Sequence, residues 1–208
     1  MNPKILIPIL IGIAVVVSLA SMYSQSEPMS VPSYEIDFTY SDVDKIQEIL
    51  AIQNIRMSSP TEIKDHTVSQ YCMFFDGNTQ KFVKYCITTA LTSSDGNPLG
   101  NLNMGGSSDT PVMALALVES HRLLDSRVSE IDFIFQTMIE TLVCDCWDEK
   151  QPGGFESVKS WLDAAEKQYL ESGETTIKST IDGLDEKQIT LEITVTEKSY
   201  LWTLIVTK

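Results

Sequence analysis

The sequence predicts an α+β fold: an N-terminal transmembrane or signal helix, then one extracytoplasmic domain with an antiparallel sheet and about three helices packed on it. Three observations predict this class. Residues 5–22 form an uncharged apolar run, two segments between residues 126 and 173 repeat apolar residues at helical spacing, and residues 175–207 hold three short alternating segments. Strand-like segments that follow one another without an intervening helix favour antiparallel pairing.

Residues 1–22 are interpreted as a membrane anchor or a signal peptide. The run from 5 to 22 is long enough to span a bilayer as a helix. It also fits a signal peptide, because Lys4 precedes the apolar region and Ala20 ends a small-residue cleavage motif. We prefer the uncleaved anchor, since the apolar run continues past a minimal signal. In both cases the rest of the chain would be extracytoplasmic, on a single-pass cell-membrane protein or, after cleavage, a secreted one.

Residues 23–33 predict a tether and residues 34–208 a single domain. The tether contains two prolines and one charged residue, which is typical of an extended spacer. The domain opens with "YEIDFTY" at 34–40, whose alternation predicts a half-buried strand. Ser41 then predicts the N-cap of a helix that should end near residues 58–60.

Two strands are expected on either side of the turn "FDGNTQ". The first is "TVSQYCMFF" at 67–75, and the second is "KFVKYCITTAL" at 81–91. If the turn centres near residue 79, Cys72 and Cys86 lie opposite one another on paired strands. A shift of one residue would place them on different faces.

The segment 93–110 predicts a long glycine-rich loop. It holds four glycines and an Asp-Gly turn, and it is long for a connection within a compact domain. Loops often carry binding residues, so this segment is the candidate binding loop. Its candidate polar residues are Asp95, Asn97, Asn101 and Asn103.

The central part of the chain predicts a buried strand and two helices. The apolar run at 111–118 predicts the strand. Ser126 or Ser129 is expected to cap a helix whose broad apolar stripe runs to Leu142. After "KQPGG", a second apolar stripe predicts a helix that ends at Gly173.

The C-terminal segments 175–182, 188–196 and 199–207 predict a meander of two hairpins. The middle segment has one apolar and one polar face. The last segment is apolar on both faces, because Leu201 and Ile205 oppose the stripe that contains Trp202. We therefore expect its second face to be covered, by another part of the chain as the preferred alternative or by a partner.

Composition argues against several functions. The chain has 15 basic and 29 acidic residues, a net charge of −14, which would repel nucleic acid. The sequence contains no nucleophile elbow, zinc-protease motif, phosphate-binding glycine loop or EF-hand spacing. We therefore expect no cofactor and no catalytic residues, and enzymatic activity is not predicted.

The four cysteines, Cys72, Cys86, Cys144 and Cys146, predict disulfides in an oxidising compartment. The preferred pattern joins Cys72 and Cys86 to Cys144 and Cys146, because a bond within "CDC" closes a very small ring. A second pattern joins Cys72 to Cys86 and leaves a separate thiol pair at 144 and 146. In a third, Cys144 and Cys146 bind soft Cu(I), or Zn with further ligands.

These observations favour a membrane-tethered, extracytoplasmic, disulfide-stabilised binding or interaction domain. It would contact the membrane through residues 5–22, and another envelope protein is its candidate partner. The alternative is an extracytoplasmic thiol redox or metal (Cu/Zn) handling protein that uses Cys144 and Cys146.

Overall fold

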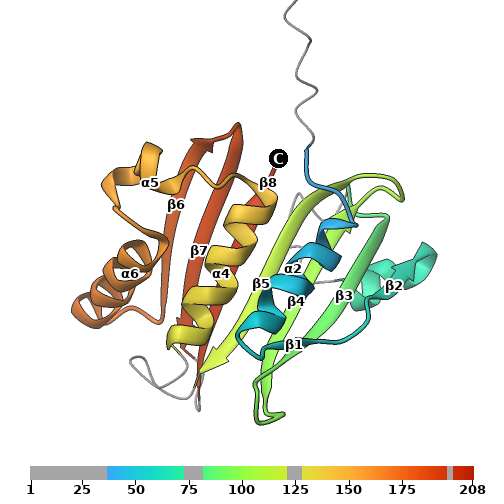
Figure 1. The fold of residues 1–208 in the computed structure, drawn as a ribbon, viewed down its shortest axis with the longest axis horizontal. Coiled ribbons are helices and arrows are strands. Elements are labelled where there is room, and N and C mark those ends of the chain that lie inside the picture. The colour runs from blue at the N-terminus through green and yellow to red at the C-terminus, as the bar shows by residue number, and fades with distance from the viewer. Residues whose placement is uncertain (1–36, 73–81, 121–127, 196–198) are drawn as a thin grey trace, which may run out of the picture. The chain divides into compact units, whose positions relative to one another are not determined.

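An antiparallel sheet of eight strands is the central element of the computed structural model, which describes residues 37–72, 82–120, 128–195 and 199–208 (Figure 1). The strand order is β1-β3-β4-β5-β8-β7-β6, and β2 also pairs with β3. The strands are β1 (Arg56–Met57), β2 (Thr61–Lys64), β3 (Tyr85–Thr92), β4 (Pro98–Gly106), β5 (Pro111–Ser120), β6 (Thr176–Leu184), β7 (Lys187–Val195) and β8 (Tyr200–Thr207).

The sheet consists of two meanders that meet at its centre. β3-β4-β5 form the first, β6-β7-β8 form the second, and the last strand of each pairs antiparallel with the other. In this central pair Ala116 of β5 lies opposite Leu204 of β8. The predicted C-terminal meander and the predicted strand at 111–118 are thereby confirmed.

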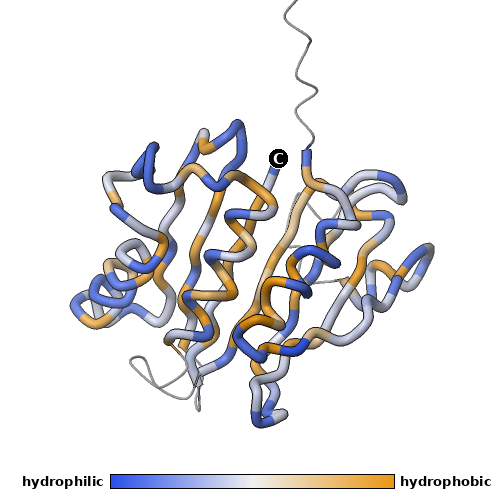
Figure 2. The backbone as a smooth tube through the Cα atoms, in the orientation of Figure 1, coloured by the Kyte–Doolittle hydropathy of each residue, from blue (hydrophilic) through white to orange (hydrophobic). Residues whose placement is uncertain are grey.

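The described helices are α2 (Asp42–Ile52), α3 (Val68–Tyr71), α4 (Val128–Leu142), α5 (Trp147–Lys150) and α6 (Val158–Ser172). The helices α2, α4, α5 and α6 cover one face of this sheet, and the short helix α3 lies on the other (Figure 1). α4 packs between α2 and α6, and its side chains Ile134, Phe135 and Met138 are fully buried. Figure 2 shows the apolar residues along α4 and the central strands. The α+β class with an antiparallel sheet is confirmed.

The two long helices of the second half form as their sequence predicts. α4 begins at Val128, so Ser129 lies inside the helix rather than at its cap, and Ser126 lies outside the described residues. Ser157 caps α6, because its Oγ accepts a hydrogen bond from the backbone N–H of Ser160 at 3.1 Å. Gly173 ends α6 with φ of 68°, a conformation that glycine adopts without a steric cost.

A second, smaller core lies on the opposite face of the sheet. Successive side chains of a strand point to opposite faces, so Ala114 and Ala116 face the helices while Met113 and Leu115 face the second core. Its buried members are Val68, Cys72, Val83, Cys86, Met113 and Leu115, and Ile205 of β8 packs against them. The apolar second face of the last strand is therefore covered in part from within the chain.

The first half of the chain differs from its prediction at two places. Residues 37–40, the described part of the strand predicted at 34–40, form no strand and lead into α2. α2 ends at Ile52 instead of near 58–60. Asn54 has φ of 59° and interrupts the helical path, and the backbone then enters β1.

The strand predicted at 67–75 is also wrong in its described part. Residues 68–71 form the single helical turn α3, and β2 takes the place beside β3 that this segment was expected to occupy. The turn expected at 75–80 lies outside the described residues. A four-residue helix is too short for its periodicity to compete with the β-propensity of "TVSQYCMFF".

Half of the predicted loop at 93–110 is strand. β4 occupies residues 98–106 and pairs with both β3 and β5. Gly100 allows β4 and β5 to lie close together, because a side chain at this position would collide with the carbonyl oxygen of Leu117.

Within the described ranges, no helix combines the length and the apolar character needed to cross a bilayer. The predicted anchor at 5–22 and the tether at 23–33 lie outside these ranges. Asp37–Lys208 form one compact unit.

Candidate functional site

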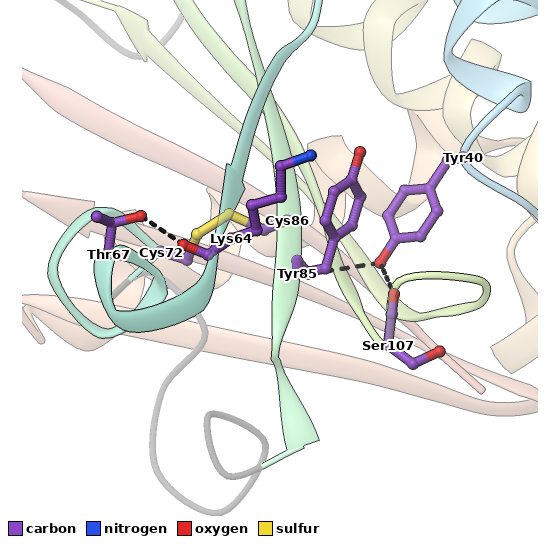
Figure 3. Close-up of a disulfide and its surroundings, with 7 residues drawn as sticks. All are labelled: Tyr40, Lys64, Thr67, Cys72, Tyr85, Cys86 and Ser107. Atoms are coloured by element: carbon purple, nitrogen blue, oxygen red, sulfur yellow. Dashed lines mark hydrogen bonds between the residues drawn. A yellow bond between two sulfur atoms is a disulfide. The ribbon is translucent and has the colours of Figure 1, made fainter.

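The first disulfide joins Cys72 to Cys86 inside the second core (Figure 3). Cys72 directly follows α3, Cys86 lies in β3, and their Cα atoms are 6.6 Å apart. Both side chains are fully buried. This bond fixes α3 against the sheet, and its position is that of a structural crosslink.

The second disulfide joins Cys144 to Cys146, so the preferred long-range pairing is wrong. Its failure has a geometric cause. Cys86 faces the second core, whereas Cys144 and Cys146 pack against the main core on the helix side. The two pairs lie on opposite faces of the sheet and cannot meet.

The Cys144–Cys146 bond connects the end of α4 to the start of α5. Val143 and Cys144 both donate their backbone N–H to the carbonyl of Ile139, at 2.9 and 3.1 Å, which ends α4. The two cysteine side chains are half-buried, and Asp145 between them is exposed. This disulfide is therefore more accessible than Cys72–Cys86.

All four cysteines are oxidised, so the metal alternative at Cys144 and Cys146 has no free thiols in this structure. Among the described residues, no group of three or more His, Cys, Asp or Glu side chains is arranged to hold a metal ion.

The four residues of the candidate binding loop do not converge. Asp95 and Asn97 are exposed in the turn between β3 and β4. Asn101 and Asn103 lie on β4 and point to the second face of the sheet, where Asn101 is exposed. Asn103 is only 1% exposed, and neither of its amide atoms has a hydrogen-bond partner among the described residues. Its neighbours across the strands are Thr88 and Leu115.

Tyr40 anchors the start of α2 to the sheet (Figure 3). Its hydroxyl donates to the carbonyl of Ser107 at 2.8 Å, and its ring meets that of Tyr85 edge-on with centroids 4.9 Å apart. Burial, followed by the nearby Tyr85, raises the pKa of Tyr40 far above its usual range. Tyr40 is consequently a structural hydrogen-bond donor and not an acid–base group.

Among the described residues, three of the surface hollows lie along the helix layer, with volumes of about 390, 340 and 270 Å³. Ile55 lines both the first and the second, and Gln136 lines both the second and the third, so the hollows are neighbours along the helix layer. The first is lined by Gln47, Ala51, Asn54, Ile55, Arg56 and Met57. The second is lined by Gln53, Ile55, Ser129, Glu130, Asp132, Phe133 and Gln136.

The third hollow is the most acidic. Glu140 of α4 and three carboxylates around α5 line it, and Lys159 is its one basic lining residue. Asp145, inside the Cys144–Cys146 ring, is among the lining residues, so the accessible disulfide borders this hollow. The lining residues are Gln136, Ile139, Glu140, Asp145, Trp147, Asp148, Glu149, Ser157, Val158 and Lys159.

A carboxylate cluster lies where α4 meets α6, beside the second and third hollows. It consists of Asp132 of α4 with Lys159, Asp163 and Glu166 of α6. Lys159 donates to both carboxylate oxygens of Asp163, at 2.8 and 2.9 Å. Among the described residues, the buried oxygens Oδ1 of Asp132 and Oε1 of Glu166 have no hydrogen-bond partner.

Electrostatics in this cluster favour the protonated carboxyl groups. Burial is the largest cause that raises the pKa of Asp132 and of Glu166. The neighbouring Asp163 raises both pKa values further, and Lys159 only partly offsets this. Without a proton or an added cation, these carboxylates are poorly stabilised.

Sequence reasoning missed this cluster and the hollows. One signal was available: Asp132, Gln136 and Glu140 follow each other at intervals of four on α4, forming a polar stripe on an otherwise apolar helix. The contribution of Glu166 could not be found this way, because it depends on how α6 packs against α4.

The described fold and site together define an α+β domain with two disulfides and a series of neighbouring hollows on its helix layer, of which the second and third are lined by carboxylates. No family model, curated protein or solved structure matches the chain.

Proposed function

We propose that this chain is a membrane-tethered, extracytoplasmic binding domain that recognises a partner protein through the three neighbouring hollows. The observation that carries this proposal is their shared lining, because Ile55 and Gln136 place the three hollows next to one another across the helix layer. Neighbouring hollows of this kind suit an extended segment of a partner better than a small molecule.

The cellular location is supported by two features. The uncharged run at 5–22 has the length of a bilayer-spanning helix. Cys72–Cys86 and Cys144–Cys146 are bonds that persist in oxidising compartments.

Fractionation of cells that express the full chain tests this location. We expect the protein in the membrane fraction with an intact N-terminus and no thiols that react with a maleimide after denaturation. A cytosolic protein whose cysteines all react would contradict the proposal.

Site-directed photo-crosslinking tests the binding surface. A photoreactive amino acid replaces Gln136, which is exposed between the second and third hollows. The matched control replaces Thr180, which is exposed on β6 and faces away from the helices. We expect one defined adduct in intact membranes from position 136 and none from position 180. Adducts of equal yield from both positions, or from neither, would contradict the proposal.

A second candidate function is thiol–disulfide exchange at Cys144–Cys146, favoured by the partial exposure of this bond beside the third hollow. A thiolate of a partner dithiol would attack one sulfur and form a mixed disulfide. The second partner thiol would then release the chain. The partner would lose two electrons and two protons, and Cys144 and Cys146 would become thiols.

Incubation of the purified protein with a reduced dithiol peptide tests this exchange. We expect peptide disulfide to form in step with new thiols at Cys144 and Cys146, while Cys72–Cys86 stays intact because it is buried. The control is the double variant Cys144→Ser/Cys146→Ser, which should form no peptide disulfide. Equal peptide oxidation by both proteins would reject the exchange function.

A further inference from the structure

The cluster between α4 and α6 contains more negative charge than its own lysine balances. Asp132, Asp163 and Glu166 surround Lys159, which already forms two hydrogen bonds with Asp163. Glu166 is only 5% exposed, its Oε1 has no partner among the described residues, and it interacts electrostatically with both Lys159 and Asp163. From the facing helix, Asp132 adds a second buried oxygen, Oδ1, that also has no hydrogen-bond partner in the described part of the chain.

An unpartnered buried carboxylate is costly, and either a proton or a cation relieves that cost. No three described His, Cys, Asp or Glu side chains are arranged for a metal ion, which argues against a coordinated inorganic cation. The ammonium or guanidinium group of a long side chain needs no coordination sphere. Its aliphatic stem can cross the apolar rim of a helix pair while its head reaches the carboxylates.

The surroundings provide both access and attraction. Asp132 lines the second hollow, Lys159 lines the third, and Gln136 lines both. The exposed carboxylates of Glu140, Asp148 and others extend the negative charge over the third hollow. This distribution attracts a basic partner at long range and brings its side chains to the cluster.

We propose that the carboxylate cluster between α4 and α6 receives a lysine or arginine side chain of the partner protein, with Asp132 and Glu166 as the groups that bind its charge. This inference rests on the proposed function and names the chemistry of the partner. The specific contact is with the buried oxygens Oδ1 of Asp132 and Oε1 of Glu166, and the exposed acidic residues provide only the attraction.

Binding of a lysine-rich peptide to the full chain in detergent tests the proposal. The ligand control is the same peptide with every lysine acetylated, which removes its charge. We expect the unmodified peptide to bind and Glu166→Gln and Asp132→Asn each to weaken binding by about tenfold, the size of one lost charge-assisted hydrogen bond.

The matched control variant is Glu171→Gln. It makes the same chemical change on the same helix, but Glu171 is exposed and contacts Lys167 at 3.8 Å. We expect a change of no more than about twofold, as for an exposed ion pair. Equal loss in all three variants would overturn the proposal, since it would mean diffuse attraction only.

A second measurement keeps the test independent of variant stability. NMR titration of wild-type protein should show that the peptide lowers the raised pKa of the Glu166 carboxyl, because a cation favours its charged form. An unchanged Glu166 titration with peptide bound would also overturn the proposal. The photo-crosslink at Gln136 does not depend on basic side chains, so it can succeed when this inference fails.

Discussion

Lys159 donates hydrogen bonds to both carboxylate oxygens of Asp163, whereas the buried Oε1 of the neighbouring Glu166 has no hydrogen-bond partner among the described residues. The three side chains follow each other along one face of α6, opposite Asp132 of α4. One lysine is thus shared among three carboxyl groups at a helix–helix contact.

This arrangement predicts that Glu166 makes the free energy of unfolding depend on pH. Its contribution is more favourable at acidic pH than at neutral pH, because its pKa is raised in the folded state. The folded-state pKa of Glu166 lies above its ordinary value of 4.5, so its stabilising effect is complete below 4.5 and is lost as the pH rises through the folded-state pKa. Glu166→Gln should remove that loss and raise the free energy of unfolding by about 1 kcal/mol at neutral pH. Urea denaturation at several pH values measures this, with Glu171→Gln as control. Parallel pH profiles for wild type and Glu166→Gln would contradict it.

The two disulfides should differ in their contribution to stability. Cys72–Cys86 spans 14 residues and lies in the second core, so Cys72→Ala/Cys86→Ala should cost about 3 kcal/mol. Cys144–Cys146 spans only two residues, and its double alanine variant should cost about half as much, because the closed loop is short. Denaturant unfolding of both variants gives the comparison. A larger loss from the 144/146 variant would show that this bond supports the packing of α5.

Asn103 offers a test of the second face of the sheet. Its buried amide has no hydrogen-bond partner among the described residues, so Asn103→Val should raise the free energy of unfolding by about 1 kcal/mol or more. Asn101→Val is the matched control, on the same face of the same strand but exposed, and it should have little effect. Thermal unfolding distinguishes the two. Loss of stability in Asn103→Val would mean that the amide has a partner in solution.

The start of α2 depends on Asp42 rather than on the expected cap Ser41. Ser41 has helical backbone angles and makes no capping bond, whereas Asp42 accepts the N–H of Thr39 at 2.7 Å. Burial raises the pKa of Asp42, but the hydrogen bonds from Lys45 and Thr39 outweigh it and leave the pKa below 3.8.

Asp42→Asn should therefore cost about 1 kcal/mol, while Ser41→Ala should be nearly neutral. The stabilisation by Asp42 is present above pH 3.8 and is lost as the pH falls through its folded-state value, so the two variants should converge in acid. Chemical denaturation at neutral and acidic pH measures both effects. An equal cost for the two variants at neutral pH would restore Ser41 as the cap.

The sequence predicts the elements with strong periodicity and fails where contacts across the fold decide. The stripes that become α4 and α6, and the alternation of Ile189, Leu191 and Ile193 in β7, are local patterns created by one buried face. Gly100, in contrast, looks like a loop residue and is in fact required where β4 approaches β5.

The candidate site shows the same division. The sequence identifies all four cysteines as disulfide-forming, but their pairing depends on which face of the sheet each one occupies. Cys86 and its neighbour Ile87 face opposite cores because consecutive residues of a strand point to opposite faces. The carboxylate cluster joins Asp132 and Glu166 from helices that are separated by α5 in the chain. No local pattern records that juxtaposition.

The pairing of the two meanders through their last strands, β5 and β8, has a consequence for folding. Within each meander, consecutive strands pair through hairpins, which close short loops at little entropic cost. The seam between β5 and β8, where Ala116 meets Leu204, instead closes a loop that contains α4, α5 and α6. Long-range pairings of this kind are slow to form, so we expect the two meanders to assemble first and hydrogen-exchange protection at the seam to appear last during refolding. The centre of the finished sheet would then be the last part of it to fold.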